Sequence, residues 1–134
     1  MRETAYTIEA MRLEDIPEVL HLEREAFGQM AWHAGDFEAA IASKCDFPLV
    51  IRTTGLAGYA VLRIIAPEAE VENICVAPAC RRSGVGEALM EEMLRLAAER
   101  DAERICLEVR AHNEPAKALY RKRGFVESYR RRNY

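Results

Sequence analysis

The pattern of apolar and polar residues along the chain predicts ten secondary-structure elements. Six strands follow from short runs that alternate or are continuously apolar, over residues 4–12, 47–53, 56–65, 71–78, 103–111 and 125–134. Four helices follow from helical spacing, over residues 13–27, 36–41, 85–99 and 113–124. The order β-α-α-β-β-β-α-β-α-β is typical of an α/β fold with a mixed sheet and helices on both faces. No repeat or linker divides the chain, so we expect a single domain over residues 1–134.

Individual residues set the expected boundaries of these elements. Pro17 fits the first helix only within its first turn, and Asp36 is the expected N-cap of the second helix. The Thr54–Gly55 pair makes a hairpin-like break between two strands. Pro78 ends a later strand, because proline cannot donate to a strand ladder. Glu23 is the polar exception on the otherwise apolar face of the first helix.

The composition is that of a soluble globular protein and narrows the choice of partners. Half of the residues are apolar, 31% are charged and the formal net charge is −3, so general attraction to nucleic acid or anionic membrane is not expected. Residues 120–134 are strongly basic, which favours either a solvated basic edge or a polyanionic partner. Neither a signal peptide nor a membrane-spanning run is visible, so we expect a cytoplasmic protein.

The cysteines give no sign of a metal site or a disulfide framework. No Cys-x-x-Cys pair occurs, and no histidine has zinc-ligand spacing from Cys45, Cys75, Cys80 or Cys106. We expect all of them to be free thiols. Cys75 and Cys106 lie in apolar strand-like runs, where a reduced cysteine behaves as a small hydrophobic residue. No bound metal is expected.

A segment with two arginines and two glycines, CRRSGVGEALMEEML (residues 80–94), leads into the third predicted helix. A helix N-terminus offers backbone N–H groups without intrahelical acceptors and the positive end of the macrodipole. Gly84 and Gly86 allow a phosphate to approach the backbone closely, and Arg81 and Arg82 add charged donors. The pattern therefore favours a phosphate-binding loop. In the alternative interpretation, Gly84 makes a tight turn and the arginines are solvated.

Two familiar phosphate loops do not fit this segment. A P-loop requires a lysine where the sequence has Glu87. A dinucleotide-binding fingerprint requires a third glycine and follows the first strand of its fold, whereas this loop follows the fourth predicted strand. If this loop binds a phosphate, it therefore belongs to neither of these two types.

The strand before the loop makes the assignment more specific. The segment ENICVAPACRRSGVGEAL resembles the acetyl-CoA-binding segment of the GNAT family of N-acetyltransferases, whose Arg/Gln-x-x-Gly-x-Gly/Ala signature is matched by residues 81–86. The predicted element order is also the GNAT order, so the resemblance covers nearly the whole chain. It implies that the phosphates are the pyrophosphate of acetyl-CoA and that residues 74–76 pair with its pantetheine arm. The residues implied to bind this co-substrate are Ile74, Cys75, Val76, Arg81, Arg82, Ser83, Gly84, Val85, Gly86, Glu87 and Asn113.

Within the family, LEVRAHNEPAKALYRKRGF followed by RRNY resembles the bacterial ribosomal-protein-alanine N-acetyltransferases, the RimI type. This resemblance implies that Glu108 is the general base and Tyr120 the general acid. A terminal α-amine has a pKa of about 8, against about 10.4 for lysine, so one carboxylate or a water relay can deprotonate it near neutral pH. The alternatives are that Glu108 pairs with Arg104 or Arg110 and that Tyr120 is a core aromatic residue.

The segment between the first two helices bears on the acceptor. In this family it helps to build the acceptor pocket, so Trp32 either forms a wall of that pocket or simply packs in the fold. The segment reads GQMAW and lacks the Pro-Trp pair that members of this type often have. His21, also considered as a base, is expected on the surface of the first helix.

The leading hypothesis is an acetyl-CoA-dependent N-acetyltransferase that modifies the N-terminal α-amino group of a protein. The implied acceptor is the N-terminal alanine of a small-subunit ribosomal protein. The alternatives are a GNAT enzyme acting on a small amine or a lysine side chain, a non-catalytic CoA-binding sensor, and a nucleic-acid-binding module. The chain ends at Tyr134, before a last strand that the family usually has, and the exposed edge this would leave predicts a monomer or a weak dimer.

Overall fold

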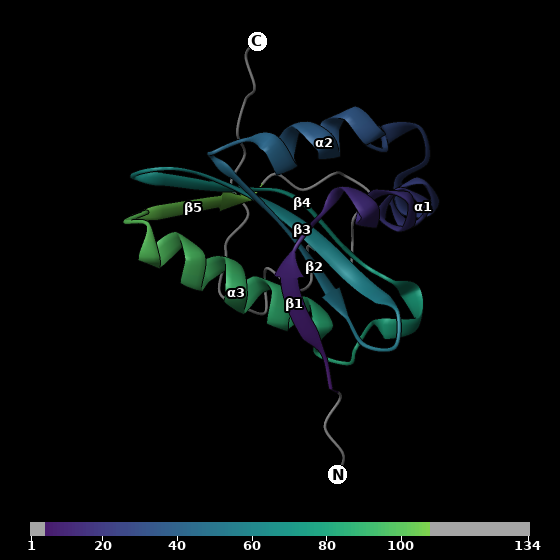
Figure 1. Cartoon of the computed structure of the whole chain (residues 1–134). Helices are drawn as coiled ribbons and strands as arrows, with labels where there is room; N and C mark the ends of the chain where they lie inside the picture. The colour runs from purple at the N-terminus through teal and green to yellow at the C-terminus, as the bar shows by residue number, and fades with distance from the viewer. Residues whose placement is uncertain (1–4, 108–134) are drawn as a thin grey trace.

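The computed structural model describes residues 5–107, and a five-stranded mixed sheet lies at its centre (Figure 1). In sequence order, which is also the spatial order, the sheet contains β1 (Thr7–Ala10), β2 (Asp46–Arg52), β3 (Leu56–Ile65), β4 (Glu68–Val76) and β5 (Arg104–Leu107). Neighbours from β1 to β4 are antiparallel, whereas β5 is parallel to β4. A parallel neighbour requires a crossover connection, and helix α3 (Val85–Glu99) provides it. The predicted α/β fold is confirmed.

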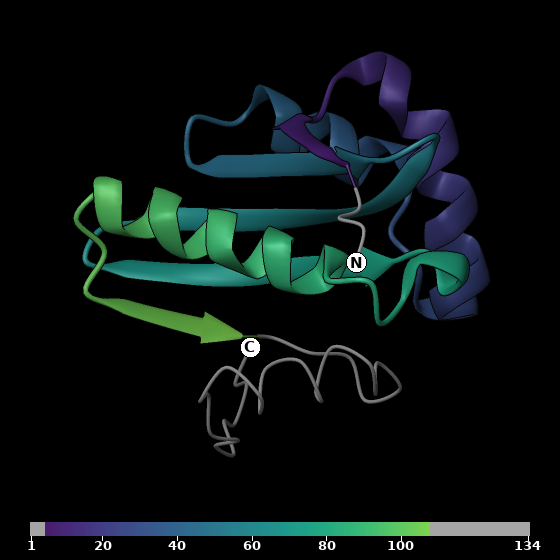
Figure 2. The same cartoon turned by 90° about the horizontal axis from the view of Figure 1, so that it is seen from below.

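Helices cover both faces of the sheet, as the sequence predicts. α1 (Ile16–Phe27) and α2 (Ala34–Ala42) lie on one face and α3 on the other (Figures 1 and 2). Successive strand side chains point to opposite faces. On β3, Ala60 and Leu62 therefore pack in the cluster under α3, while Tyr59 and Val61 pack in the cluster under α1 and α2.

Some expected boundaries are confirmed and others are corrected. Pro17 lies in the first turn of α1. The second helix begins at Ala34 with His33 as its N-cap. Asp36 is its N3 residue, and its carboxylate accepts the His33 backbone N–H at 2.8 Å. β4 begins at Glu68 instead of residue 71, and exposed and buried residues alternate there as in a strand. It ends at Val76, two residues before Pro78, which begins a 3-10 helix instead of ending the strand.

Short 3-10 helices complete the described chain, at Leu13–Asp15, Gly28–Met30 and Pro78–Cys80. The predicted helix over 113–124, the strand over 125–134 and the continuation of β5 beyond Leu107 lie outside the described residues. The single domain predicted for residues 1–134 includes these segments and stays a prediction.

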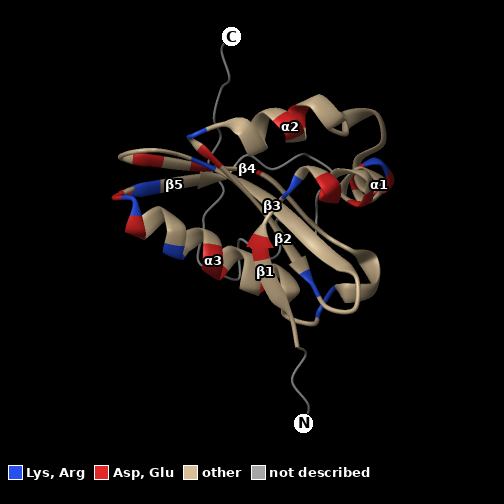
Figure 3. Ribbon diagram, viewed as in Figure 1, with Lys and Arg blue, Asp and Glu red and all other residues tan. Residues whose placement is uncertain are grey.

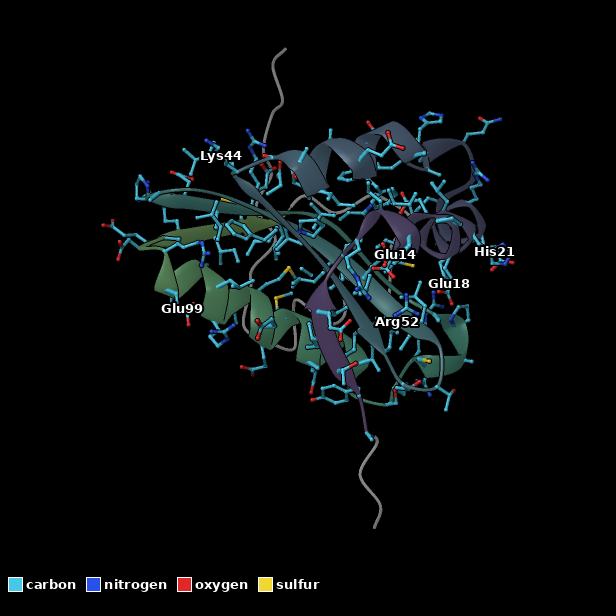
Figure 4. All side chains as sticks on the ribbon, in the orientation of Figure 1. Glu14, Glu18, His21, Lys44, Arg52 and Glu99 are labelled. Carbon is cyan, nitrogen blue, oxygen red and sulfur yellow. The ribbon has the colours of Figure 1, made fainter. Side chains whose placement is uncertain are left out.

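Charged side chains lie mainly on the helices and at strand ends, and the middle of the sheet carries few of them (Figure 3). Arg52, at the end of β2, donates to Asp15 at 2.6 Å and to Glu18 at 3.1 Å, which ties the sheet to the start of α1 (Figure 4). His21 is exposed on the outer side of α1, 3.4 Å from Glu25, so its expected surface position is confirmed. Within residues 5–107, none of the helices combines the length and the apolar character that a membrane span needs.

Candidate active site

The loop before α3 has the geometry of an anion-binding site. Gly84 is the N-cap of α3 and has a φ of +87°, a left-handed conformation that glycine adopts without a steric penalty. Val85 is buried in the core and fixes the first turn, while Arg81 and Arg82 are exposed. The first N–H groups of a helix have no intrahelical acceptor, so these groups and the arginines fit a phosphate. The predicted residues 81–87 thus lie together in one loop and helix start.

A hydrogen bond within the loop supports this conformation. The Ser83 hydroxyl donates to the backbone carbonyl of Cys80, across the turn that leads into α3. Arg82 has a φ of +66°, the left-handed region that non-glycine residues seldom adopt. A turn held in this way keeps the two exposed arginines beside the start of the helix.

β4 leads directly toward this loop and carries the residues predicted to pair with the pantetheine arm. Ile74 and Cys75 are buried on opposite faces of the sheet, and Val76 is half-buried. Gly58 of β3 lies opposite Val76, and a Cβ atom added to it would come within 2.7 Å of the Cys75 carbonyl oxygen. The two strands approach this closely because residue 58 has no side chain. Gly58 therefore sets the backbone position of residues 74–76.

A β-bulge in β4 changes which residues face α1 and α2. Leu62 of β3 pairs with Val71, but the next residue, Val61, pairs with Asn73. Glu72 is the extra residue, and a bulge of this kind is a common means of redirecting side chains next to an active site.

Glu72 is a half-buried carboxyl group with a shifted pKa. Its burial, together with the neighbouring carboxylate of Asp46, raises the pKa of Glu72 to about 7. Asp46 lies on the α1 and α2 face, because the adjacent Phe47 packs in the cluster under α3. Arg63 donates to Asp46, with Nη1 3.0 Å from Oδ2. Glu72 thus lies two residues before Ile74 with a pKa suited to a general base near neutral pH.

Glu23, the polar exception on the apolar face of α1, is fully buried beside β4. Its Oε1 accepts from the Tyr59 hydroxyl at 2.6 Å and from Asn73 Nδ2 at 3.0 Å. Its Oε2 accepts from the backbone N–H of Trp32 at 2.9 Å. Burial is the main cause that raises the pKa of Tyr59 above its usual value, so this hydroxyl stays protonated and donates. One carboxylate therefore connects α1, β3, β4 and the segment after α1.

The Trp32 side chain packs against the same region. Its ring lies 5.1 Å from the ring of Phe37, centroid to centroid, and Phe37 in turn meets Tyr59 edge-on at 5.9 Å. Such tilted and edge-on pairs are favoured by the aromatic quadrupole. The packing alternative for Trp32 is therefore observed, and its role as an acceptor wall stays a prediction.

The predicted catalytic pair, Glu108 and Tyr120, and the predicted co-substrate ligand Asn113 lie outside the described residues. The described part of β5 ends at Leu107, which pairs with Val71 of β4, one residue before the bulge. Within residues 5–107, no group of three or more His, Cys, Asp or Glu side chains is arranged to hold a metal ion.

Four residues of β3 and β4 that shape the region next to the candidate site were not predicted from the sequence: Gly58, Tyr59, Glu72 and Asn73. An isolated glycine in an apolar strand pattern signals a close backbone approach, and this signal could have identified Gly58. Glu72 and Asn73 carry no local signal, because their orientation depends on the bulge. The polar exception at Glu23 is a real signal, but its partners in the sheet lie 36 and 50 residues away in the sequence.

The glycine-containing anion loop at the start of the crossover helix, next to a strand with a bulge, fits a transferase whose co-substrate carries phosphate groups. The chain matches the model of the acetyltransferase (GNAT) family over residues 13–125 and belongs to that family. The protein is an acetyl-CoA-dependent N-acetyltransferase. The expected fold, co-substrate and enzyme class are confirmed.

Within the family, the chain is similar to enzymes of the RimI type. The [ribosomal protein bS18]-alanine N-acetyltransferase of Escherichia coli (strain K12) is 33% identical over 129 residues, which cover 96% of this chain and 86% of that protein. A Bacillus subtilis (strain 168) protein, whose name provisionally assigns the same activity, is 35% identical over 132 residues, or 98% of this chain and 87% of its own. The crystal structure of the ribosomal-protein-S18-alanine N-acetyltransferase from Escherichia coli aligns with a TM-score of 0.81 at 32% identity, covering 97% of this chain and 83% of that one.

Proposed function

We propose that this enzyme transfers the acetyl group of acetyl-CoA to the N-terminal α-amino group of ribosomal protein bS18, at an N-terminal alanine. The observation that carries the proposal is the similarity, over 96% of the chain, to an Escherichia coli enzyme named for this activity. The anion loop and the bulged strand beside it lie within the aligned region and fit the co-substrate that such a transfer uses.

Acetyl-CoA supplies an acetyl group activated as a thioester. In our proposal its pyrophosphate is held by residues 81–87, where exposed arginines flank a helix N-terminus. Residues 74–76 pair with the pantetheine arm, and Asn113 adds a further contact. A backbone N–H of residues 74–76 polarises the thioester carbonyl and stabilises the negative charge that develops on its oxygen.

The reaction forms one bond and breaks another at the carbonyl carbon. The neutral α-amine attacks this carbon, a C–N bond forms, and the C–S bond to CoA breaks. Glu108 accepts the proton that the amine loses, and Tyr120 donates a proton to the departing thiolate. A terminal amine with a pKa of about 8 is already partly neutral at physiological pH, so a carboxylate is a sufficient base.

Glu72 is a second candidate for the base. Its raised pKa, about 7, and its place on the bulge of β4 support this assignment. The two candidates differ in a measurable way. If Glu108 is the base, Glu108→Gln lowers kcat by about 100-fold or more while Glu72→Gln changes it little. The opposite result assigns the base to Glu72.

The proposal is tested by measuring the intact mass of peptides incubated with the enzyme and acetyl-CoA. One peptide begins with the free alanine of the bS18 N-terminus, and a second is N-blocked and contains an internal lysine. We expect one acetyl group on the first peptide only, and a strongly reduced rate with Glu108→Gln.

Other outcomes identify the alternatives. Acetylation of the lysine peptide or of a small polyamine instead of the alanine peptide would move the acceptor to those amines. Binding of CoA without turnover on any of them would identify a CoA sensor.

Light scattering of the purified protein tests the monomer or weak dimer that we propose. A ribosomal acceptor implies a cytoplasmic site of action.

A further inference from the structure

The segment of residues 28–33, which we name the α1–α2 loop, presents apolar and polar side chains to solvent next to the candidate site. Gln29 and Met30 are exposed, and Met30 is 63% exposed although it is apolar. Trp32 is half-buried on Phe37. Within the loop, the Trp32 backbone N–H donates to Glu23, 2.9 Å from Oε2.

The other oxygen of Glu23 is directed to the sheet. Oε1 lies 3.0 Å from Asn73 Nδ2 on β4 and 2.6 Å from the Tyr59 hydroxyl on β3. Asn73 directly precedes Ile74, the first residue of the strand segment assigned to the pantetheine arm. A single carboxylate, which is fully buried, therefore lies between the α1–α2 loop and that segment.

The placement of the loop relative to the anion site is also informative. α3, whose N-terminus forms the anion site, lies on one face of the sheet, and α1 with the α1–α2 loop lies on the other (Figures 1 and 2). A co-substrate bound by its phosphates at Gly84 and by residues 74–76 thus reaches β4 from the side of α3. The amine must approach its thioester from a different direction, and the α1–α2 loop is linked to β4 through Glu23 on the opposite face.

From this geometry we infer that Glu23 is a positioning residue for the acceptor. Its carboxylate fixes the α1–α2 loop to β4, and this contact determines how tightly the amine-bearing peptide binds beside the thioester. The inference rests on the proposed function for the identity of the peptide, and on the structure alone for the position of the loop.

The chemistry of the carboxylate makes a specific variant informative. Glu23 offers two acceptor oxygens, one toward the sheet donors and one toward the Trp32 N–H. Glutamine has the same shape but only one acceptor. In Glu23→Gln, an amide NH2 that faces the Trp32 N–H opposes a donor with a donor, while the carbonyl still serves Tyr59 and Asn73. Tyr59→Phe is the matched control, because it removes a sheet donor from the same carboxylate and leaves the Trp32 contact in place.

The kinetic test compares these two variants with the bS18 N-terminal peptide and acetyl-CoA. We expect Glu23→Gln to raise the KM of the peptide by about tenfold, the effect of one lost charge-assisted hydrogen bond, with little change in the KM of acetyl-CoA. Tyr59→Phe should change the peptide KM by less than about threefold. Thermal unfolding of both variants shows whether their losses of stability are comparable.

A readout independent of activity comes from Trp32, because it is the one tryptophan of the chain. Excitation at the long-wavelength edge of the protein absorption selects the fluorescence of Trp32. Acrylamide should quench this emission more strongly in Glu23→Gln than in the wild type or in Tyr59→Phe. Should Glu23→Gln fail to fold, amide hydrogen exchange of the wild type decides. A Trp32 amide that exchanges as slowly as core amides supports the inference, and one that exchanges as fast as exposed Gln29 overturns it.

Each remaining outcome also decides the matter. An unchanged peptide KM in Glu23→Gln, or an equal increase in Tyr59→Phe, overturns the positioning role. If the wild-type enzyme does not acetylate the peptide, the proposed function fails. In that case the quenching and exchange measurements still test whether Glu23 holds the loop.

Discussion

Replacing Gly58 with alanine would place a methyl group against the backbone of β4, at the segment assigned to the pantetheine arm. The added Cβ would lie 2.7 Å from the Cys75 carbonyl oxygen and 3.4 Å from both Ile51 Cγ2 and Val76 Cα. Reaching an ordinary carbon–oxygen contact requires the strands to separate by about 0.6 Å. The neighbour is backbone, paired in the sheet, so a rotamer change cannot relieve the contact.

The size of the effect follows from this geometry. Overpacking of this kind in a well-packed interior costs about 1–3 kcal/mol. For a chain of this length, each kcal/mol lowers the melting temperature by about 4 °C. Because the displaced atoms belong to residues 75 and 76, we also expect a several-fold increase in the KM of acetyl-CoA.

Urea unfolding monitored by circular dichroism measures the loss of stability, and initial rates at varied acetyl-CoA measure the KM. Gly35→Ala is the matched control, because nothing lies within 4 Å of a Cβ added at this exposed position of α2. Alanine there should stabilise the helix by up to about 1 kcal/mol. If the free energy of unfolding of Gly58→Ala lies within about 0.5 kcal/mol of the wild-type value and the KM of acetyl-CoA is unchanged, the contact assigned between residues 74–76 and the pantetheine arm is wrong.

Two further predictions concern the site. Gly84→Ala should lose about 1–2 kcal/mol of stability, because the φ of +87° is strained for alanine while the surrounding space is open, and it should raise the KM of acetyl-CoA. Gly84→Asn should lose less, since asparagine tolerates this conformation, and an equal loss would contradict the reasoning. The pKa of Glu72 is raised to about 7, so the folded protein keeps a proton that the unfolded chain has already lost. The contribution of Glu72 to the stability of the fold is therefore complete below about pH 4.5 and is lost as the pH rises through 7. Allowing for solvent screening of this half-exposed group, Glu72→Gln should gain about 1 kcal/mol relative to the wild type between pH 5 and pH 8, and parallel stability curves for the two proteins would contradict the shift.

The helices and strands were predicted well where the spacing of nearby apolar residues indicates which face of the element is buried. The strands under α1, α2 and α3 and the face of α3 appear in the pattern, because each depends on residues two to four positions apart. The start of β4 was missed, since Glu68 and Glu70 interrupt the apolar pattern and only Ala69 between them is buried. Asp36 was predicted as the N-cap of α2, but it is the N3 residue and stabilises the helix start through a capping box with His33.

The site was predictable only where its residues are contiguous. The loop of residues 81–87 was identified from its arginines and glycines, and the structure brings these residues together. The cluster around Glu23 depends on contacts between distant segments, with Tyr59 36 and Asn73 50 residues away. The register of paired strands cannot be determined from a single sequence, so the partners of the Glu23 carboxylate could not be predicted.

The extra residue of the β4 bulge affects the surroundings of two carboxylates, Glu23 and Glu72, whose contacts could not be predicted from the sequence. In a regular strand, alternation would send the side chains of residues 72 and 73 to opposite faces. The bulge shifts the register after Val71, so Asn73 reaches Glu23 while Glu72 approaches Asp46 on the same face. In our proposal the acceptor also approaches on this face, because α3 and the anion loop occupy the other. The bulge therefore determines two things together: the fixing of the α1–α2 loop by Glu23, and the position of a carboxyl group with a pKa near 7 on the strand that binds the thioester in our proposal.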